Sequence, residues 1–334
     1  MEAKGFGYHS LPQRFVSRYS DGKWSEGALT GDDKIVLSES ACVLQYAQTV
    51  FEGLKAYKTK DGRIVCFRPD LNAERLADSC NRMKIPPISK ELFLESVDKV
   101  VSANSEYIPD FGSGGALYLR PFVIGTTAVL GVKPATEFEY RIFASPVGSY
   151  FSGNARPITL RVCDFDRAAP HGTGHIKAGL NYAMSLYAIV DAHEKGYDEN
   201  LYLDSATRTF VEETGGANVI FEKADGTFVT PKSDTILPSI TRRSIVELAK
   251  NSFGIKVEER KVPASELKDF VGCGLCGTAA VISPVGRIDY DGESILYSES
   301  GKPDGKMMKL RELLVKIQTG EEKAPDGWIR EIKA

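Results

Sequence analysis

The stretch His171-Gly-Thr-Gly-His-Ile-Lys-Ala-Gly-Leu-Asn-Tyr182 places a single lysine, Lys177, between a glycine-rich loop and a long amphipathic segment. A lysine at such a position is expected to be partly buried. Partial burial near other cationic groups is what makes a lysine amine nucleophilic enough for Schiff-base chemistry. The competing interpretation is an ordinary surface lysine, because most lysines in proteins are exposed. The two interpretations of Lys177 are distinguished by the residues found elsewhere in the chain.

The composition is that of a globular protein of about two domains, since 42% of the 334 residues are hydrophobic and 26% are charged. A net charge of −3 and a pI near 5.9 give no general electrostatic reason to bind nucleic acid or an anionic membrane. No apolar run approaches the roughly 20 residues of a membrane span, and the first residues match no signal or transit peptide. We therefore expect a cytoplasmic protein whose partners are small molecules or copies of itself.

The six cysteines favour reduced thiols in apolar surroundings, because the chain shows no secretory signal. Cys273-Gly-Leu-Cys276 has the spacing of a redox or zinc motif. A zinc site needs a second pair of ligands, however, and none of the four histidines is spaced to supply one. No metal is expected.

Apolar runs of strand length alternate with helical periodicity along the chain. In the first half we predict strands near Val50 and over 64–67, helices from Pro69 and from Ser89, and strands over 116–124 and 140–147. In the second half we predict a helix from the Lys177 loop to Gly196, helices over 240–250 and 307–317, and strands over 200–203, 217–221, 227–230, 279–284 and 287–290. This mixture predicts an α+β chain whose two lobes enclose a cleft.

The run Tyr-Phe-Ser-Gly-Asn-Ala-Arg-Pro, from 150 to 157, has loop chemistry and no periodicity. Such composition is typical of a linker between domains. We therefore predict an N-terminal domain over 1–149, a linker over 150–157 and a larger C-terminal domain over 158–334.

One candidate function is nucleotide binding, because Gly172-Thr-Gly174 and Lys177 superficially match a phosphate-binding loop. A P-loop needs four residues between its glycines and then Gly-Lys-Ser/Thr, and a dinucleotide fingerprint needs a third glycine that opens the helix. The sequence has neither feature. Nucleotide binding is therefore the weaker interpretation.

The other candidate function is pyridoxal phosphate catalysis, which needs a lysine, a carboxylate for the ring nitrogen and anchors for the phosphate. Val211-Glu-Glu213-Thr-Gly-Gly-Ala-Asn218 places two carboxylates before a glycine-rich bend, although a solvated turn would have the same pattern. Ile236-Leu-Pro-Ser-Ile-Thr-Arg-Arg243 begins a helix whose backbone N–H groups suit a phosphate, or which Ser239 merely caps. The run 274–280 adds a hydroxyl group and small residues. Each signal is weak alone.

Together, in order and in approximate spacing, these stretches resemble the fold-type IV pyridoxal phosphate enzymes. Over nearly its whole length the chain resembles a branched-chain amino acid aminotransferase. The motifs that carry this resemblance are Phe51-Glu-Gly-Leu-Lys-Ala-Tyr57, Phe67-Arg-Pro-Asp-Leu-Asn72, Leu117-Tyr-Leu-Arg-Pro121, Pro146-Val-Gly-Ser-Tyr-Phe151, Lys177 with Asn181-Tyr182, Glu213 to Asn218, Ile236-Leu-Pro238 and Gly277-Thr-Ala279.

The resemblance implies two α/β domains joined by a short linker, with pyridoxal 5′-phosphate at the domain interface, and a homodimer. It implies ping-pong transamination of leucine, isoleucine and valine with 2-oxoglutarate, which yields branched-chain 2-oxo acids and L-glutamate. No nucleic acid or membrane partner is implied.

The resemblance also implies roles for individual residues at the cofactor. Lys177 would form the Schiff base and later carry a proton between the substrate α-carbon and the cofactor. Glu213 would pair with the pyridinium nitrogen, and Tyr182 would hydrogen-bond the ring hydroxyl oxygen. The phosphate would be held by the side chains of Arg68 and Thr278 and by the backbone N–H groups of Ile240 and Thr241.

Substrate contacts are implied by the same motifs. An apolar pocket for the branched side chain would be walled by Phe6, Phe51, Tyr118 and Tyr150, with Val132 of the partner subunit at its edge. Tyr46 and the backbone at Thr278-Ala279 would receive the α-carboxylate. Arg120 would receive the distal carboxylate of glutamate or 2-oxoglutarate. For the aromatic residues alone, core packing is the competing interpretation.

The sequence departs from the family pattern in three places. Gly216, at the cofactor, stands where many relatives have threonine, so a side-chain contact is absent there. Leu180 replaces a glycine between Lys177 and Tyr182. Ala280 and Ser283 occupy the positions of the redox cysteine pair of mammalian mitochondrial relatives, so that thiol switch is not expected.

Two alternative functions compete with this interpretation. A D-amino acid aminotransferase or an aminodeoxychorismate lyase would have the same fold, but is not expected to show the Tyr118-Leu-Arg120 and Phe51-Glu-Gly-Leu-Lys patterns. A non-enzymatic module that only stores the cofactor would not need both Lys177 and Glu213.

Overall fold

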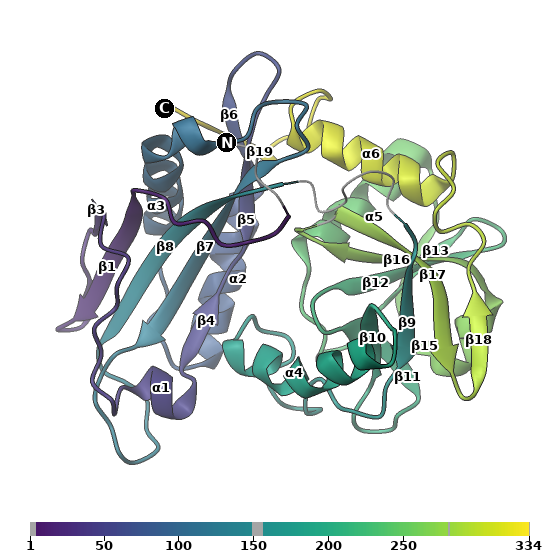
Figure 1. Cartoon of the computed structure of the whole chain (residues 1–334), viewed down its shortest axis with the longest axis horizontal. Coiled ribbons are helices and arrows are strands. Elements are labelled where there is room, and N and C mark those ends of the chain that lie inside the picture. Colours follow the sequence, from purple (N-terminus) through teal and green to yellow (C-terminus); the bar gives the residue numbers. More distant parts are fainter. Residues whose placement is uncertain (1–4, 149–155, 280, 334) are drawn as a thin grey trace. The chain divides into compact units, whose positions relative to one another are not determined.

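The computed structural model describes residues 5–148, 156–279 and 281–333. The chain divides into two compact units, each built around a sheet with helices (Figure 1). Unit 1 contains Met1–Tyr150, Ile176–Leu180 and Lys316–Ala334, and unit 2 contains Phe151–His175 and Asn181–Val315. The predicted α+β class is confirmed.

The sheet of unit 1 has the order β19-β6-β5-β7-β8-β1-β2, with β3 beside β1 and β4 beside β7. Its neighbouring strands pair antiparallel. The strands are β1 (Arg14–Ser20), β2 (Lys23–Trp24), β3 (Ala28–Thr30), β4 (Thr49–Phe51), β5 (Leu54–Lys58), β6 (Ile64–Phe67), β7 (Ala116–Gly125), β8 (Phe138–Val147) and β19 (Ile329–Ile332).

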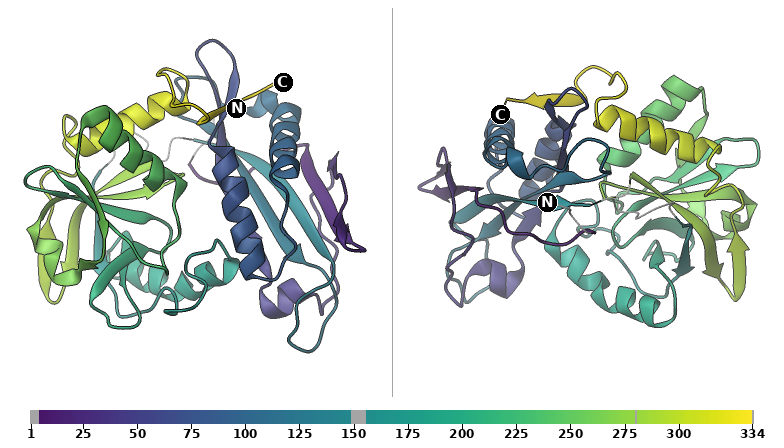
Figure 2. Two further views of the ribbon diagram at one scale, coloured as in Figure 1. Left: turned by 180° about the vertical axis from the view of Figure 1, so that it is seen from behind. Right: turned by 45° about the horizontal axis from the view of Figure 1, so that its top comes forward.

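Helices cover one face of this sheet, as Figure 2 shows for α2 and α3. The helices of unit 1 are α1 (Cys42–Tyr46), α2 (Pro69–Arg82), α3 (Lys90–Ala103) and the short 3-10 helix η1 (Ser105–Tyr107). Pro69 opens α2 as predicted, and the Ser89 hydroxyl caps α3 by accepting from the Leu92 N–H at 3.1 Å. Side chains of both helices, such as Leu76 and Phe93, are fully buried in the core of the unit.

Strand β7 has two different faces. Leu117 and Leu119 are fully buried, whereas Tyr118 and Arg120 are only half-buried. This alternation follows from the two-residue period of a strand. It leaves Tyr118 and Arg120 on the face opposite the leucines.

The sheet of unit 2 has the order β14-β13-β12-β16-β17-β9-β10-β11-β15, with β18 beside β17. The strands are β9 (Ile158–Val162), β10 (Glu199–Leu203), β11 (Phe210–Thr214), β12 (Asn218–Lys223), β13 (Phe228–Pro231), β14 (Val257–Arg260), β15 (Val262–Pro263), β16 (Phe270–Gly277), β17 (Val281–Tyr290) and β18 (Glu293–Leu296).

The helices of the second half of the chain are α4 (Gly179–Glu194), α5 (Ile240–Phe253), the 3-10 helix η2 (Ala264–Asp269) and α6 (Lys306–Gln318). Helix α5 packs on β16. The first two residues of α4 and the last three of α6 belong to unit 1.

The division into units differs from the predicted domains in two segments. The C-terminal residues from Lys316 onward belong to unit 1, because β19 pairs with β6 from Ile329↔Phe67 to Ile332↔Ile64. The segment Ile176–Leu180 also belongs to unit 1. Both assignments arise from contacts between residues distant in sequence. Most of the predicted linker, 150–157, lies outside the described residues.

Several strands were not predicted or were predicted with different bounds. The runs 279–284 and 287–290, predicted as two strands, fall largely within one strand, β17. Pro284 pairs with Gly274 of β16, and the pairing with β9 continues past Gly286 after a register shift between Val285 and Arg287. The glycine-rich run from 274 belongs in part to β16, where glycines pair as strand residues. Strands β1 and β19 are rich in charged or polar residues, and so lack the apolar run that would predict them.

The Glu52 carboxylate is fully buried in unit 1, directly after β4. The Arg75 guanidinium on α2 donates to both of its oxygens, at 2.7 Å from Nε and 2.8 Å from Nη2. The Asn72 amide adds a third hydrogen bond of 2.7 Å. A buried charge is tolerated only when it is paired and hydrogen-bonded, so these contacts tie β4 to α2.

We predict that Arg75→Ala lowers the free energy of unfolding of unit 1 by about 3–5 kcal/mol, because it leaves the Glu52 carboxylate buried without its cation. Urea denaturation followed by circular dichroism measures this change. Arg330→Ala is the matched control. It breaks the half-exposed ion pair with Asp98, at 2.5 Å, and should cost at most about 1 kcal/mol. Equal losses in the two variants would contradict the prediction.

Candidate active site

Lys177 lies in the five-residue segment that belongs to unit 1. Its neighbours Ile176 and Ala178 are buried in the core of that unit. The backbone N–H of Lys177 donates to the Ser79 hydroxyl at 3.1 Å, and its carbonyl accepts from the Phe51 N–H at 3.0 Å. The Lys177 ammonium lies 4.8 Å from the centre of the Phe51 ring. The chain therefore holds the lysine backbone firmly while its amine faces an aromatic ring.

Arg120 and three aromatic residues form a cluster on the half-buried face of β7. The Arg120 guanidinium lies 4.8 Å from the Phe51 ring centre and 5.4 Å from that of Tyr118. Arg120 Nη2 also donates to the Tyr118 hydroxyl at 3.1 Å, and Phe6 meets the Tyr118 ring edge-on at 4.9 Å. Because Phe51 contacts both Arg120 and Lys177, the structure brings four predicted substrate residues and the predicted catalytic lysine together.

Gly53 permits this cluster to form. A Cβ atom added to Gly53 would lie 2.1 Å from the Tyr118 hydroxyl oxygen, far inside van der Waals contact. Glycine is therefore required for the close approach of the Tyr118 side chain. Glu52 and Gly53 stand within the motif Phe51–Tyr57, but neither was predicted to have a role. Gly53 lies between β4 and β5, which both pair with β7, and its backbone therefore passes close to the Tyr118 side chain of β7.

Glu213 is a deeply buried carboxylate on β11 of unit 2. Its Oε1 accepts from Arg167 Nη2 and from the Leu237 N–H, both at 2.8 Å, and its Oε2 accepts from the Asn218 amide at 2.6 Å. Burial raises the pKa of Glu213, and the positive charge of Arg167 opposes that rise. A cationic ring nitrogen beside this carboxylate would favour its ionised form in the same way. Neither Arg167 nor Asn218 was predicted to act here.

The start of α5 suits an anion. The Ser239 hydroxyl accepts from the Arg242 N–H at 3.1 Å, so the cap uses the third N–H of the helix. The two preceding donors, the N–H groups of Ile240 and Thr241, have no acceptor within the helix, because the first turn lacks preceding carbonyls. The cap and the predicted phosphate site are therefore compatible.

Four more predicted residues lie in unit 2. Tyr182 is half-buried in the first turn of α4, and Thr278 and Ala279 form the turn after β16. Gly216 lies in the bend between β11 and β12. No atom lies within 4 Å of a Cβ added there, so the absent side chain leaves space.

Arg68 lies at the N-terminus of α2 in unit 1 with a left-handed backbone, at φ 47°. Its guanidinium lies 4.3 Å from the ring centre of Trp328, and its N–H donates to the Trp328 carbonyl at 2.7 Å. Trp328 was not predicted to act near the site. It comes from the C-terminal segment, and no local pattern relates it to Arg68.

The structure does not bring every predicted substrate residue into the Arg120 cluster. The Tyr46 hydroxyl donates to the Leu130 carbonyl, and Val132 is 86% exposed on the same loop. Tyr150 lies outside the described residues, so its prediction stands untested.

The Cys273 and Cys276 thiols are both fully buried in β16. Burial raises the pKa of Cys276 to about 12 and that of Cys273 as well. Thiols with such pKa values are poor nucleophiles and poor metal ligands near neutral pH.

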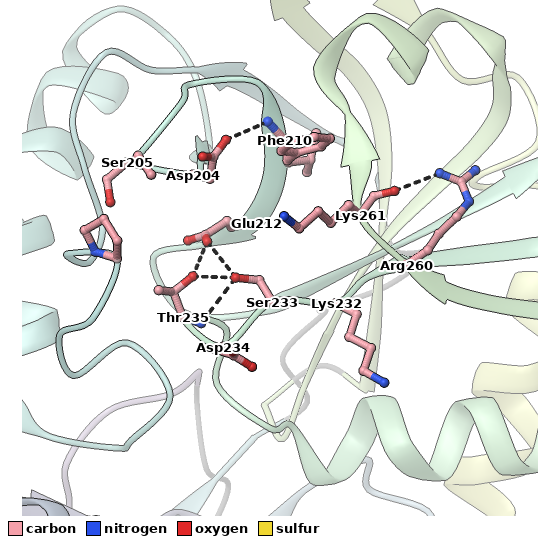
Figure 3. A pocket seen from close by; sticks show the side chains of 13 residues that line it. Asp204, Ser205, Phe210, Glu212, Lys232, Ser233, Asp234, Thr235, Arg260 and Lys261 are labelled. Atoms are coloured by element: carbon pink, nitrogen blue, oxygen red, sulfur yellow. Dashed lines mark hydrogen bonds between the residues drawn. The ribbon is translucent and has the colours of Figure 1, made fainter.

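Glu212, next to Glu213, faces the other side of β11. The hydroxyls of Ser233 and Thr235 both donate to its Oε1, as Figure 3 shows. A cavity of about 470 Å³ lies on this side, lined in part by Lys232, Lys261 and Glu212. No residue predicted for the cofactor or the substrate lines it. The two adjacent glutamates therefore have separate surroundings.

Residues 49–288 match the family model "Amino-transferase class IV". A Helicobacter pylori protein named branched-chain-amino-acid aminotransferase is 46% identical over 98% of this chain and 96% of its own length. The Escherichia coli branched-chain amino acid aminotransferase superposes with a TM-score of 0.80 at 27% identity, over 96% of this chain and 99% of that chain. The enzyme of the same name from T.th., solved with pyridoxamine 5′-phosphate, gives a TM-score of 0.78 at 26% identity, over 95% of this chain and 97% of that chain.

The chain is therefore a member of the class IV aminotransferases. The fold-type IV architecture and the prediction of a pyridoxal phosphate enzyme are confirmed. Within that class, the identity over nearly the whole length places the chain in the branched-chain-amino-acid aminotransferase family.

We predict that Gly53→Ala raises the KM for leucine about tenfold or more, because the added methyl group displaces Tyr118 from the Arg120 cluster. Steady-state kinetics with saturating co-substrate measures the effect. Gly31→Ala is the control, since its added Cβ meets only an ordinary contact of 3.5 Å. A wild-type KM in Gly53→Ala would show that Tyr118 is not required at the substrate.

Proposed function

We propose that this protein transfers the amino group of L-leucine, L-isoleucine or L-valine to 2-oxoglutarate, with the residues named above as its catalytic and binding groups. The observation that carries the proposal is the cluster of Lys177, Phe51, Tyr118 and Arg120 within one unit. It combines a primary amine, an apolar wall and a cation. These are the groups needed to accept both apolar and acidic amino acids.

Lys177 carries the covalent and proton-transfer chemistry in this proposal. Pyridoxal 5′-phosphate, when bound, supplies a ring that accepts the electrons left behind when the substrate α-carbon loses its proton. With the cofactor bound, the Lys177 amine would take that proton and would return it to the cofactor C4′ carbon. Its fixed backbone suits this role, because only the four-carbon side chain would have to move between the substrate α-carbon and the cofactor C4′ carbon.

Glu213 sets the charge of the cofactor ring. Its carboxylate would accept a hydrogen bond from the ring nitrogen of the bound cofactor, and the pair of opposite charges would keep that nitrogen protonated. Arg167 and Asn218 hold the carboxylate in place through their hydrogen bonds. Tyr182 would donate a hydrogen bond to the hydroxyl oxygen of the same ring.

The phosphate of the cofactor would be held by backbone N–H groups and by two side chains. The Ile240 and Thr241 N–H groups would donate from the start of α5, where the helix dipole also favours an anion. Arg68 and Thr278 would add side-chain donors. Trp328 supports this role, because its ring beneath the guanidinium orients Arg68.

Arg120 allows one pocket to alternate between substrates. With 2-oxoglutarate, the guanidinium binds the distal carboxylate. With leucine there is no such carboxylate, and the Phe51 and Tyr118 rings then stabilise the cation. Its Nε is buried without a hydrogen-bond partner among the described residues, which supports a ligand at this position.

We further propose a cytoplasmic homodimer. Leu130 and Val132 are 93% and 86% exposed, and large exposed apolar side chains on one loop support burial against a partner. Light scattering of the purified protein tests the dimer. In the described part of the chain, no helix is long and apolar enough to cross a membrane.

We predict that Lys177→Ala removes the visible absorbance of the bound cofactor and lowers kcat by about 10³-fold or more, because the Schiff base and the proton carrier are both lost. Absorption spectra and a leucine–2-oxoglutarate assay measure these effects. Lys90→Ala, at an exposed ion pair with Glu74, should keep both properties. Undiminished turnover in Lys177→Ala would overturn the assignment.

We predict that Arg120→Ala raises the KM for 2-oxoglutarate about tenfold or more and changes the KM for leucine much less, because only the dicarboxylate loses a charged partner. The two constants come from initial rates with each substrate varied in turn. Arg63→Ala, an exposed arginine of unit 1, is the control. Equal increases for both substrates would show that Arg120 does not bind the distal carboxylate.

A further inference from the structure

A ring of hydrogen bonds, closed by the peptide bond between Phe51 and Glu52, passes through the backbone of Lys177 in unit 1. The Lys177 carbonyl accepts from the Phe51 N–H, and Glu52 follows Phe51 in the chain. The Glu52 carboxylate is bound by the Arg75 side chain. The Arg75 carbonyl accepts from the Ser79 hydroxyl at 2.8 Å, and that hydroxyl accepts from the Lys177 N–H at 3.1 Å.

Ser79 is the link that connects α2 to the lysine. Its side chain is fully buried, one helical turn after Arg75. A hydroxyl has one donor and two acceptor lone pairs, and Ser79 uses the donor within its own helix and one lone pair for Lys177. Alanine at this position would keep the helix but would remove the acceptor.

We infer that Ser79 is a positioning residue, which fixes the backbone of Lys177 and thereby the point from which its amine reaches the reacting atoms. The Phe51 N–H fixes the other side of the same residue, and the bridge between Val50 and Ala178 extends that contact. The backbone is thus held on both sides of the side chain. A displacement of about 1 Å at a reacting group can cost about 10²-fold in rate. The rate part of this inference rests on the proposed role of Lys177, whereas the hydrogen bond itself does not.

The matched control is Ser96. It is also a fully buried serine on a helix of unit 1, and its hydroxyl donates to the carbonyl of its own helix, that of Phe93, at 2.7 Å. Its other contact is the Tyr140 hydroxyl, at 2.9 Å, and so belongs to the core. Ser96→Ala therefore reproduces the loss of a buried hydroxyl from a helix without touching Lys177.

The first measurement is hydrogen–deuterium exchange of the holoenzyme and the apoenzyme, read by mass spectrometry on peptides that contain Lys177. In Ser79→Ala we expect the Lys177 amide to exchange at least about tenfold faster than in the wild type, because its acceptor is gone. In Ser96→Ala it should exchange at the wild-type rate. Unchanged exchange in Ser79→Ala would overturn the inference, as would an equal increase in both variants.

The second measurement separates kcat from KM with leucine. Ser79→Ala should lower kcat about tenfold or more and change KM less than about threefold, because the substrate groups on β7 stay in place. It should also shift the pH dependence of the visible absorbance of the holoenzyme, which Ser96→Ala should leave unshifted. Wild-type kcat and an unshifted pH profile in Ser79→Ala would overturn the inference.

Conservative variants at the same position complete the test. Ser79→Thr retains the hydroxyl and should restore kcat to within about threefold of the wild type. If Ser79→Ala is poorly folded by circular dichroism, Ser79→Cys replaces it, since sulfur fills the space but accepts hydrogen bonds weakly. Failure of Lys177→Ala to lose activity would refute the role of the lysine, while the exchange measurement would still test the Ser79 contact.

Discussion

The buried ion pair between Glu52 and Arg75 is the constraint on which the rest of unit 1 depends. A carboxylate with no exposed surface must keep its cation within hydrogen-bond distance, because an unpaired charge in the interior is far less stable than in water. The pair therefore fixes the distance between the end of β4 and α2. Phe51 stands beside Glu52 in the chain, and Ser79 lies one turn beyond Arg75. The backbone of Lys177 is hydrogen-bonded to both of these residues, to the Phe51 N–H and to the Ser79 hydroxyl.

Unit 2 uses the same arrangement at Glu213. Each buried glutamate is bound by an arginine and by an asparagine amide, which are Arg75 and Asn72 for Glu52, and Arg167 and Asn218 for Glu213. The physical reason is shared, because an arginine neutralises the charge and an amide satisfies a remaining lone pair. The functions differ. Glu52 acts on the backbone of unit 1, whereas Glu213 is proposed to act on the cofactor.

Sequence predicted the motifs of the site better than the contacts that support them. Lys177, Glu213 and Arg120 stand in stretches whose composition or order marks them. Arg75 and Arg167 do not, because an arginine in a helix or a loop is usually exposed and its burial depends on a distant carboxylate. The same limit explains the errors in the fold. The helices α2, α3 and α5 carry local signals, such as Pro69 and the Ser89 and Ser239 caps, and their first residues were predicted correctly. The assignment of 176–180 and of β19 to unit 1 depends on pairing over more than a hundred residues, which local periodicity does not encode.

The hydrogen bonds that hold the backbone of Lys177 also determine the timescale on which its amine moves. A residue held through its N–H and its carbonyl cannot travel with a flexible loop, so its motion is confined to rotation about side-chain bonds. Such rotations take picoseconds to nanoseconds, whereas loop movements reach microseconds. A turnover of typical enzymes, of about 1–10³ s⁻¹, leaves ample time for the amine to visit both atoms between which it carries a proton. Rotation of the Lys177 side chain is therefore too fast to limit such a turnover.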